Sequence, residues 1–329
     1  MANALQANNK NVKLCLPPRF FEKGRLSEWV NSRLDTSILL HIDKFSHFLA
    51  KNRHEYLAVF DTYDLQYVSR NSGIDIDGLQ FVLIDDLALT ARSFSQGGVT
   101  IVPNILFPDH QSYAPSWTDM PKNRWLHGPS YVLLDPKFHM TDNERIKIRR
   151  QREARLVSCI SGGEALRVLI SFGEAVTQLE PLIKQRVSEA LHLLKSQMAR
   201  TEVIALGKSA IAMCGELGLE CRSEAFLGLE KMRYLYTTSD VYLGAIGYSM
   251  WERSAMGLPS FVVPIAENQK PYAEIGDKLG IHNIMTVLSE KPSVLKNLFL
   301  CMIEKTIKLK FGFEGYLSLL KEAPNGKSS

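Results

Sequence analysis

A stretch in the last third of the chain places a hydroxyl and a carboxylate just after a glycine turn. It reads LGAIGYSMWERSAMGLPSFVVPIAENQ and runs from Leu243 to Gln269. Its first apolar run ends near Gly247, which permits a tight turn, and Ser249 then opens a short amphipathic helix. A helix that begins after such a turn presents free N–H groups to a phosphate. Glu252 lies one turn further on, from where its carboxylate can reach a diol such as that of a ribose.

The same residues also have a purely structural interpretation. Ser249-x-x-Glu252 matches a capping box, in which each side chain bonds the backbone N–H of the other residue, and on this pattern alone the capping box is favoured. The second apolar run, Ser260–Ala266, changes the balance because it leads into the polar triplet Glu267–Gln269. Core packing gives no reason for this triplet, whereas amide side chains can hydrogen-bond sugar hydroxyl and acetamido groups. Together the two signals indicate a nucleotide–sugar site.

Two blocks of alternating strand-like and helix-like segments must position these residues. In the first block, near-continuous apolar runs are typical of parallel strands covered on both faces. These runs are Val12–Pro17, Ser37–Ile42, Tyr56–Asp61, Phe81–Asp86 and Val99–Asn104. In the second block we expect strands at Leu166–Gly173, Glu202–Gly207, Leu235–Ala245 and Ser260–Ala266, with helices at Leu179–Met198 and Ser293–Leu309.

This alternation predicts an α/β protein with two Rossmann-like domains that face each other across a cleft. The segment Gly128–Phe138 is expected to be an irregular connection, and the charged stretch Thr141–Arg155 that follows it is predicted to be an interdomain linker. We therefore expect one domain over residues 1–155 and another over residues 156–329. Ligands of open α/β sheets usually bind at the carboxyl ends of the strands.

Composition narrows the class of protein. The 329 residues have a hydrophobic fraction of 45% and a net charge of +4, with acids and bases mixed along the chain, which does not favour nucleic-acid binding. The basic run Arg145–Arg155 is either a solvated, partly helical connector or an anion-attracting patch. The sequence gives no indication of the oligomeric state.

Cysteine usage and hydropathy indicate a protein of the cytoplasm. The five cysteines have no metal-ligand spacing, and their odd number without a secretory signal favours free thiols. We find neither a run long enough to span a membrane nor a signal peptide. No dinucleotide-binding fingerprint is present either, so we expect no metal and no redox cofactor.

The order of motifs resembles that of the UDP-sugar hydrolases of pseudaminic acid biosynthesis, which are similar to the MurG-like branch of the GT-B glycosyltransferases. The family's GGSTLWE, GxP and NQ motifs correspond here to Gly247–Glu252, to Gly257 with Pro259, and to Asn268 with Gln269. The resemblance covers nearly the whole chain.

In the N-terminal half the resemblance is looser. Asp61 and Tyr63 match an Asp-x-Tyr stretch of the family, and the strand that ends in Asp85-Asp86-Leu87 matches a strand ending in Asp-Asp-Leu. The segment HGPSYVLLDPKF resembles the one that leads into the interdomain linker of the family.

The resemblance implies roles for these residues. UDP would bind to the C-terminal domain, with Glu252 on the ribose diol and the amides of Ser249 and Met250 on the diphosphate. Asn268 and Gln269 would face the sugar. The implied reaction is hydrolysis at the anomeric carbon, which releases UDP and a 2,4-diacetamido-2,4,6-trideoxy sugar.

Two departures from the family pattern bear on the chemistry. Members begin with a strand and a Gly-x-Gly-His-x-x-Arg loop, whereas Met1–Asn11 matches only the helix that follows, so the water-activating histidine is absent from the given sequence. We therefore expect poor hydrolysis or none; if turnover is nevertheless full, Asp61 or Asp85 at a strand end is the candidate catalytic base. The second departure follows Gly173, which, like Tyr63, we expect to bind the substrate. Glu174 would bring negative charge near a diphosphate there, although Thr177 can still supply a hydroxyl.

Three hypotheses therefore stand. The chain is a hydrolase of a UDP-activated amino sugar, a glycosyltransferase of the same fold that passes the sugar to an acceptor, or a nucleotide-sugar-binding protein without catalysis. In all three the partner is a UDP-sugar.

Overall fold

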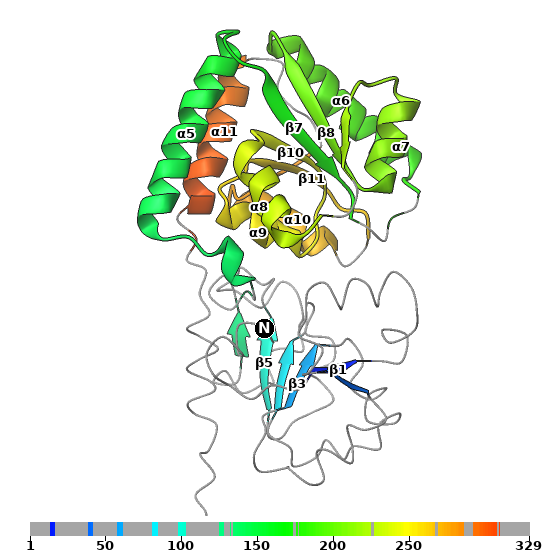
Figure 1. The fold of residues 1–329 in the computed structure, drawn as a ribbon, viewed down its shortest axis with the longest axis vertical. Helices are drawn as coiled ribbons and strands as arrows, with labels where there is room; N and C mark the ends of the chain where they lie inside the picture. Colours follow the sequence, from blue (N-terminus) through cyan, green and yellow to red (C-terminus); the bar gives the residue numbers. More distant parts are fainter. Residues whose placement is uncertain are drawn as a thin grey trace, which may run out of the picture. The chain divides into compact units, whose positions relative to one another are not determined.

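The computed structural model describes the backbone of six strands in the first 127 residues, and then residues 132, 134–173, 176, 178–224, 227–266, 269–285, 292–307 and 309 (Figure 1). The chain divides into two compact units. One unit comprises Met1–Pro136 with Gly312–Ser329, and the other comprises Lys137–Phe311.

The first unit contains two parallel sheets. β1 (Leu14–Leu16) pairs with β2 (Leu39–His41) in one of them. The other has four parallel strands in chain order, namely β3 (Ala58–Asp61), β4 (Phe81–Ile84), β5 (Gly98–Val102) and β6 (Trp125–His127). Four of the five apolar runs predicted here contain a strand, and the fifth, Val99–Asn104, overlaps β5. The strand β6 was not predicted because Trp-Leu-His is too short to show a hydrophobic pattern.

The second unit is built on a parallel sheet with the strand order β12-β11-β10-β7-β8-β9. The strands are β7 (Leu166–Ser171), β8 (Thr201–Leu206), β9 (Arg222–Glu224), β10 (Val241–Ala245), β11 (Ser260–Val263) and β12 (Asn283–Ile284). The chain starts in the middle at β7, moves outward to β9, and returns to β10 before moving outward on the other side. This is the order of a doubly wound Rossmann sheet.

Helices connect and cover these strands. They are α5 (Asp142–Ile160), α6 (Pro181–Gln197), α7 (Lys208–Glu216), α8 (Leu229–Thr238), α9 (Ser249–Ala255), α10 (Lys270–Lys278) and α11 (Pro292–Ile307), preceded by the short 3-10 helix η9 (Pro136–Phe138). In Figure 1, α5 and α11 lie side by side at one edge of the unit.

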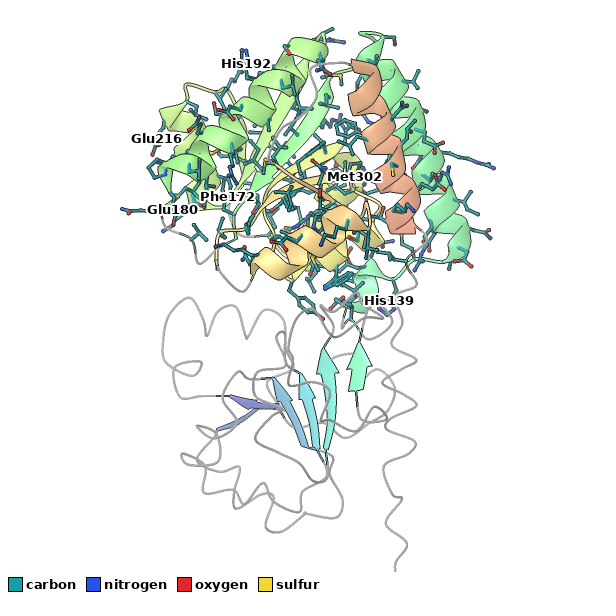
Figure 2. The ribbon with its side chains drawn as sticks, turned by 180° about the vertical axis from the view of Figure 1, so that it is seen from behind. His139, Phe172, Glu180, His192, Glu216 and Met302 are labelled. Carbon is teal, nitrogen blue, oxygen red and sulfur yellow. The ribbon has the colours of Figure 1, made fainter. Side chains whose placement is uncertain are left out.

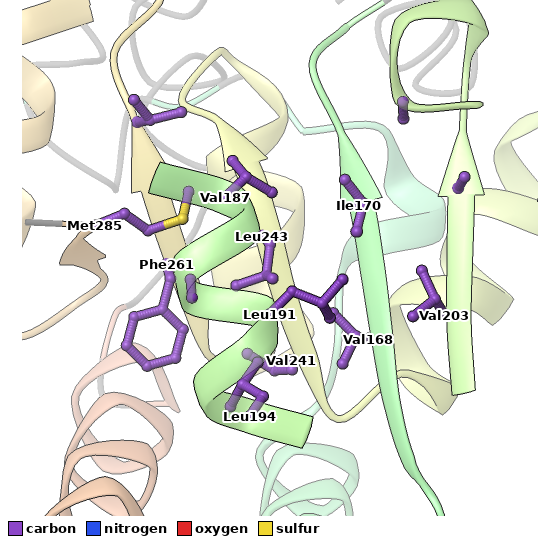
Figure 3. Close-up of a cluster of buried hydrophobic side chains, with 14 of the residues drawn as sticks. Val168, Ile170, Val187, Leu191, Leu194, Val203, Val241, Leu243, Phe261 and Met285 are labelled. Atoms are coloured by element: carbon purple, nitrogen blue, oxygen red, sulfur yellow. The ribbon is translucent and has the colours of Figure 1, made fainter. Parts of the chain in front are cut away.

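The core of the second unit lies between the sheet and α6 (Figure 3). Val187, Leu191 and Leu194 of the helix pack over Val168 of β7 and Leu243 of β10, and all five side chains are almost completely buried. Figure 2 shows the contrast with the outer surface, where His192 and Glu216 project into solvent. Because each Leu or Val contributes about 1.5–3 kcal/mol when it is fully buried, this layer is a main source of stability.

Two predictions about secondary structure were wrong. Leu235–Ala245 is not one strand, because α8 continues to Thr238 and β10 begins only at Val241. The stretch Thr141–Arg155 is not a linker but most of α5, which Thr141 opens in a full capping box with Glu144. Because most of its residues are charged, the sequence shows no clear apolar pattern of a helix here. The predicted domain boundary at residue 155 falls inside α5.

An ion pair fixes α5 to the sheet of the second unit. Arg155 donates from Nε and Nη2 to the two oxygens of Asp240, at 2.8 and 2.9 Å, and the Arg167 backbone N–H donates to the same carboxylate at 2.8 Å. Asp240 stands immediately before β10, with its side chain only 6% exposed. A two-pronged, partly desolvated pair of this kind is stronger than an exposed one.

Arg152, on the same helix, is buried and holds the ends of two other helices. Its guanidinium donates to the carbonyl oxygens of Tyr236, Ser239 and Met256, which follow or end α8 and α9. Burial lowers the pKa of Arg152 to about 10, so the charged form is retained at neutral pH. The helix predicted to be a linker therefore positions the two helices nearest the candidate site.

We predict that Arg152→Met lowers the free energy of unfolding of the second unit by about 3 kcal/mol or more, because several buried carbonyl groups lose their donor. The matched control is Arg150→Met on the same helix, where the side chain is exposed and the expected change is about 0.5 kcal/mol or less. Thermal unfolding together with hydrogen exchange in α8 and α9 measures both. Equal effects of the two substitutions would contradict the role given to Arg152.

Candidate functional site

The centre of the second sheet is a topological switch point. β7 and β10 are neighbours, but the chain leaves them toward opposite edges of the sheet, so the loops that follow them diverge. Ligands of doubly wound sheets bind in the crevice that such diverging loops leave. The described loop residues here are Phe172 and Gly173 directly after β7 and Ile246–Tyr248 after β10.

Each of these loops contains a glycine with open space at the position where a side chain would lie. Gly173 has a φ of +84° and is exposed, and a methyl group added there or at Gly247 would meet no described atom within 4 Å. Because glycine has no side chain, a ligand can approach the backbone more closely at these two positions than it could at any other residue type. The structure thus brings Gly173 and Gly247, which the sequence predicted as binding residues, to neighbouring strand ends.

The strands themselves approach unusually closely at this point. Gly244 in β10 has a φ of +149°, and a side-chain carbon there would lie 1.9 Å from the Ser171 carbonyl oxygen. The Tyr242 hydroxyl lies 2.7 Å from this same oxygen and 2.9 Å from the carbonyl oxygen of Ala245. One buried phenol therefore joins the carboxyl ends of β7 and β10.

The start of α9 is not a capping box. Tyr248 occupies the cap position without a side-chain cap, and Ser249 is the first helical residue. The Ser249 hydroxyl oxygen instead accepts from Nη1 of Arg253 at 2.9 Å. The backbone N–H of Met250 donates to the Gly247 carbonyl at 2.9 Å, so of the two amides that the family resemblance assigns to a diphosphate, this one is occupied here.

Glu252 lies on α9 beside the end of α8. Its carboxylate accepts from the Tyr236 hydroxyl at 3.4 Å, and its side chain is only partly buried. Burial first, and then the negative charge of Glu252, raise the pKa of Tyr236 well above its usual value. The phenol therefore stays protonated, and it can orient the carboxylate while part of that group remains accessible.

Arg253 is the most deeply buried charge of the site, with 1% exposure. Its guanidinium stacks on the Tyr242 ring at 3.8 Å, and Nη2 lies 3.5 Å from the Ala245 carbonyl oxygen. Burial raises the pKa of Tyr242, an effect that the charge of Arg253 opposes. Helix α9 is thereby tied to β10 and, through Tyr242, to β7.

The remaining predicted residues are spread over the chain. Gln269, just before α10, accepts from the Ile265 N–H at 2.9 Å through its side-chain oxygen, which leaves its amide nitrogen to face a ligand. Asp61 is the last residue of β3 in the first unit. Four predicted residues lie outside the described residues, namely Tyr63, Asp85, Thr177 and Asn268.

Sequence reasoning missed Tyr236, Tyr242, Gly244 and Arg253. Arg253 had a detectable signal, because it stands in an amphipathic segment on the side that also carries Met250 and Ser254, both buried. Three described histidines belong to this unit: His139 is exposed just after η9, His192 projects outward from α6, and His282 is buried with Nε2 3.0 Å from the Ala273 carbonyl oxygen.

Among the described residues, no group of three or more His, Cys, Asp or Glu side chains could hold a metal ion. None of the described helices is long and apolar enough to cross a membrane.

No family model matches this chain, and no curated protein does. Several solved structures are similar to it over nearly its whole length. MurG of Acinetobacter baumannii is 14% identical, with a TM-score of 0.55, over 98% of this chain and 93% of that chain. UGT2 of Phytolacca americana, complexed with UDP-2fluoro-glucose and pterostilbene, is 12% identical, with a TM-score of 0.56, over 98% and 94%.

A third similar structure is the UDP-GlcNAc 2-epimerase of Neisseria meningitidis bound to UDP-GlcNAc. It is 12% identical, with a TM-score of 0.51, over 85% of this chain and 79% of that chain. At these identities the likeness concerns the fold. The chain has the GT-B fold with two Rossmann-like domains, which confirms the fold class predicted from the sequence.

Proposed function

We propose that the second unit binds the UDP moiety of a UDP-sugar at the switch point between β7 and β10. The observation that carries this proposal is the pair of open glycines, Gly173 after β7 and Gly247 after β10, at the centre of a Rossmann-like sheet. Two proteins of the same fold, the Phytolacca and Neisseria enzymes, are named as complexes with UDP-sugars, which supports a ligand of this class.

Glu252 is the proposed ligand of the ribose diol. Its carboxylate is partly accessible and is held by Tyr236, so it can accept from the two hydroxyl groups with little loss of side-chain freedom. Gly173 and Gly247 let the diphosphate approach the backbone, and the Ser249 amide and the Thr177 hydroxyl are proposed donors to it. Asn268, and the free amide nitrogen of Gln269, are proposed to face the sugar.

The proposed reaction is hydrolysis of a UDP-activated diacetamido-trideoxy sugar in nonulosonic (pseudaminic-type) acid biosynthesis. A water oxygen forms a bond to the anomeric carbon, the bond from this carbon to the diphosphate oxygen breaks, and UDP leaves with the electron pair. The proton of the water passes to a base, for which Asp61 and Asp85 are the candidates, with Tyr63 beside the sugar. The diphosphate is a good leaving group and needs little acid assistance.

A glycosyltransferase of the same fold is the second candidate, since several similar structures are named glycosyltransferases. From sequence, the basic run Arg145–Arg155 was the one hint of an acceptor surface. In the structure much of that run is internally engaged: Arg152 on backbone carbonyls, Arg155 on Asp240, and Arg149 on Glu153 at 2.7 Å. This engagement favours the hydrolase.

We predict that Glu252→Gln weakens UDP binding by about 1.5–3 kcal/mol, because the diol loses a charge-assisted acceptor. Stability should change much less, since Tyr236 can still donate to the amide oxygen. Isothermal titration calorimetry with UDP and thermal unfolding measure the two effects. Glu220→Gln, an exposed site on the same unit, is the control and should change neither. Unaltered affinity in Glu252→Gln would remove Glu252 from the binding site.

We further predict that the chain converts its UDP-sugar to UDP and free sugar, and that Asp61→Asn or Asp85→Asn lowers kcat by about a hundredfold to ten-thousandfold with little change in UDP affinity. In water enriched in oxygen-18, the released UDP should carry no label, because the new bond forms at carbon. Sugar transfer to an added acceptor without release of free sugar would assign the chain to the glycosyltransferases instead.

A further inference from the structure

The guanidinium of Arg253 is a buried charge without a carboxylate partner. Within the described part of the chain it forms no ion pair, and its contacts are the Ser249 hydroxyl, the Ala245 carbonyl and the Tyr242 ring. Its Nε is buried and has no hydrogen-bond partner there. Burial of an uncompensated charge is costly, so such a residue calls for an explanation beyond packing.

The neighbouring arginines show how this chain otherwise neutralises such groups. Arg155 forms an ion pair with the Asp240 carboxylate, and Arg152 donates hydrogen bonds to three backbone carbonyl groups. Arg253 has fewer contacts than either, although it is the most deeply buried of the three. Its charge is therefore available to act on a group outside this network.

That charge lies at the edge of the proposed nucleotide site. Ala245 ends β10 and Ser249 begins α9, so the loop Ile246–Tyr248 starts and ends at contacts of Arg253. The guanidinium is surrounded by the neutral side chains of Tyr242 and Ser249, and its burial keeps it from contact with bulk solvent. A charge in such a low-dielectric setting acts over greater distances than it does in water.

Glu252 creates the need for this positive charge. If its carboxylate holds the ribose, it also repels the diphosphate of the same ligand. The seven-residue helix α9 offers few aligned peptide dipoles to offset that repulsion, and Glu174 follows directly after Gly173. Arg253 is the nearest basic residue in sequence and contacts the same helix start, so it can offset the repulsion without contacting the ligand.

We infer that Arg253 is a positioning residue whose buried charge makes the switch-point site select a nucleoside diphosphate over the neutral nucleoside. It fixes Ser249 and the end of β10 through hydrogen bonds, and it offsets the charge of Glu252 through space. This inference rests on the proposed function, because it concerns the same site and the same ligand class.

The test measures the affinity of the full chain for UDP and for uridine by isothermal titration calorimetry. Arg253→Met removes the charge and keeps an apolar stem, and it should lower the ratio of UDP affinity to uridine affinity roughly tenfold. Arg253→Lys keeps the charge and should retain most of that ratio. Tyr242→Phe tests the geometric role alone: it removes the hydrogen bonds to the Ser171 and Ala245 carbonyls but leaves the charge, so the affinities for UDP and uridine should fall together and their ratio should stay as in the parent.

The outcomes separate the two proposals. If the parent binds UDP and Arg253→Met lowers both affinities equally, or Tyr242→Phe lowers the ratio as much, Arg253 is structural and the inference fails while the nucleotide site stands. If Arg253→Met does not fold, Arg253→Gln takes its place, because glutamine also removes the charge but keeps an amide donor for Ser249; an unchanged ratio of UDP to uridine affinity in that variant overturns the inference. A folded parent that binds neither ligand would overturn the nucleotide site, and the inference with it.

Discussion

The close approach of β7 and β10 is the constraint on which the centre of the second unit depends. It requires a glycine at position 244, because any side chain would collide with the Ser171 carbonyl. Parallel strands that end together at a switch point normally leave their last carbonyl groups exposed to the crevice. Here the Tyr242 hydroxyl lies within hydrogen-bond distance of both, so the strand ends stay fixed and the loops beyond them start from defined positions.

The side chains packed against α6 and the polar side chains around α9 contribute differently, the former to the stability of the fold and the latter to the geometry of the candidate site. On the side of α6 the contacts are apolar, and Val187 and Leu191 tolerate few changes of volume but carry no chemistry. The network of Tyr242, Arg253 and Ser249 is polar and buried. Such networks hold one geometry when they are satisfied, and they lose it when a single member is removed. The network thus serves to place Gly247 and the start of α9.

Sequence reasoning succeeded where a signal is local. Leu166–Gly173 is centred on Val168–Ile170, three consecutive apolar residues that are all buried because β7 is covered on both faces, and the glycine turn at Gly247 follows β10 as its sequence predicts. It failed where the signal depends on partners distant in the chain. From its sequence, Thr141–Arg155 is predicted to be a solvated linker. In the structure, Arg155 pairs with the Asp240 carboxylate and Arg152 donates to carbonyl groups at the end of α8, and neither partner is close in sequence. The three-residue strand β6 is too short to show the alternation of apolar and polar residues that predicts a strand.

Buried arginines near the site illustrate why charge alone is a poor guide to function. Arg152 satisfies backbone carbonyls at the ends of helices, which any helical protein must manage. Its charge is incidental to that role, and burial lowers its pKa to about 10. Arg253 has fewer hydrogen bonds and an aromatic ring in place of a carboxylate. A ring offers an attraction that is weaker than an anion's and does not cancel the field. The positive charge of Arg253 thus lies beside the loop Ile246–Tyr248 with no carboxylate bonded to it among the described residues, and this is the observation from which its role toward an anionic ligand is inferred.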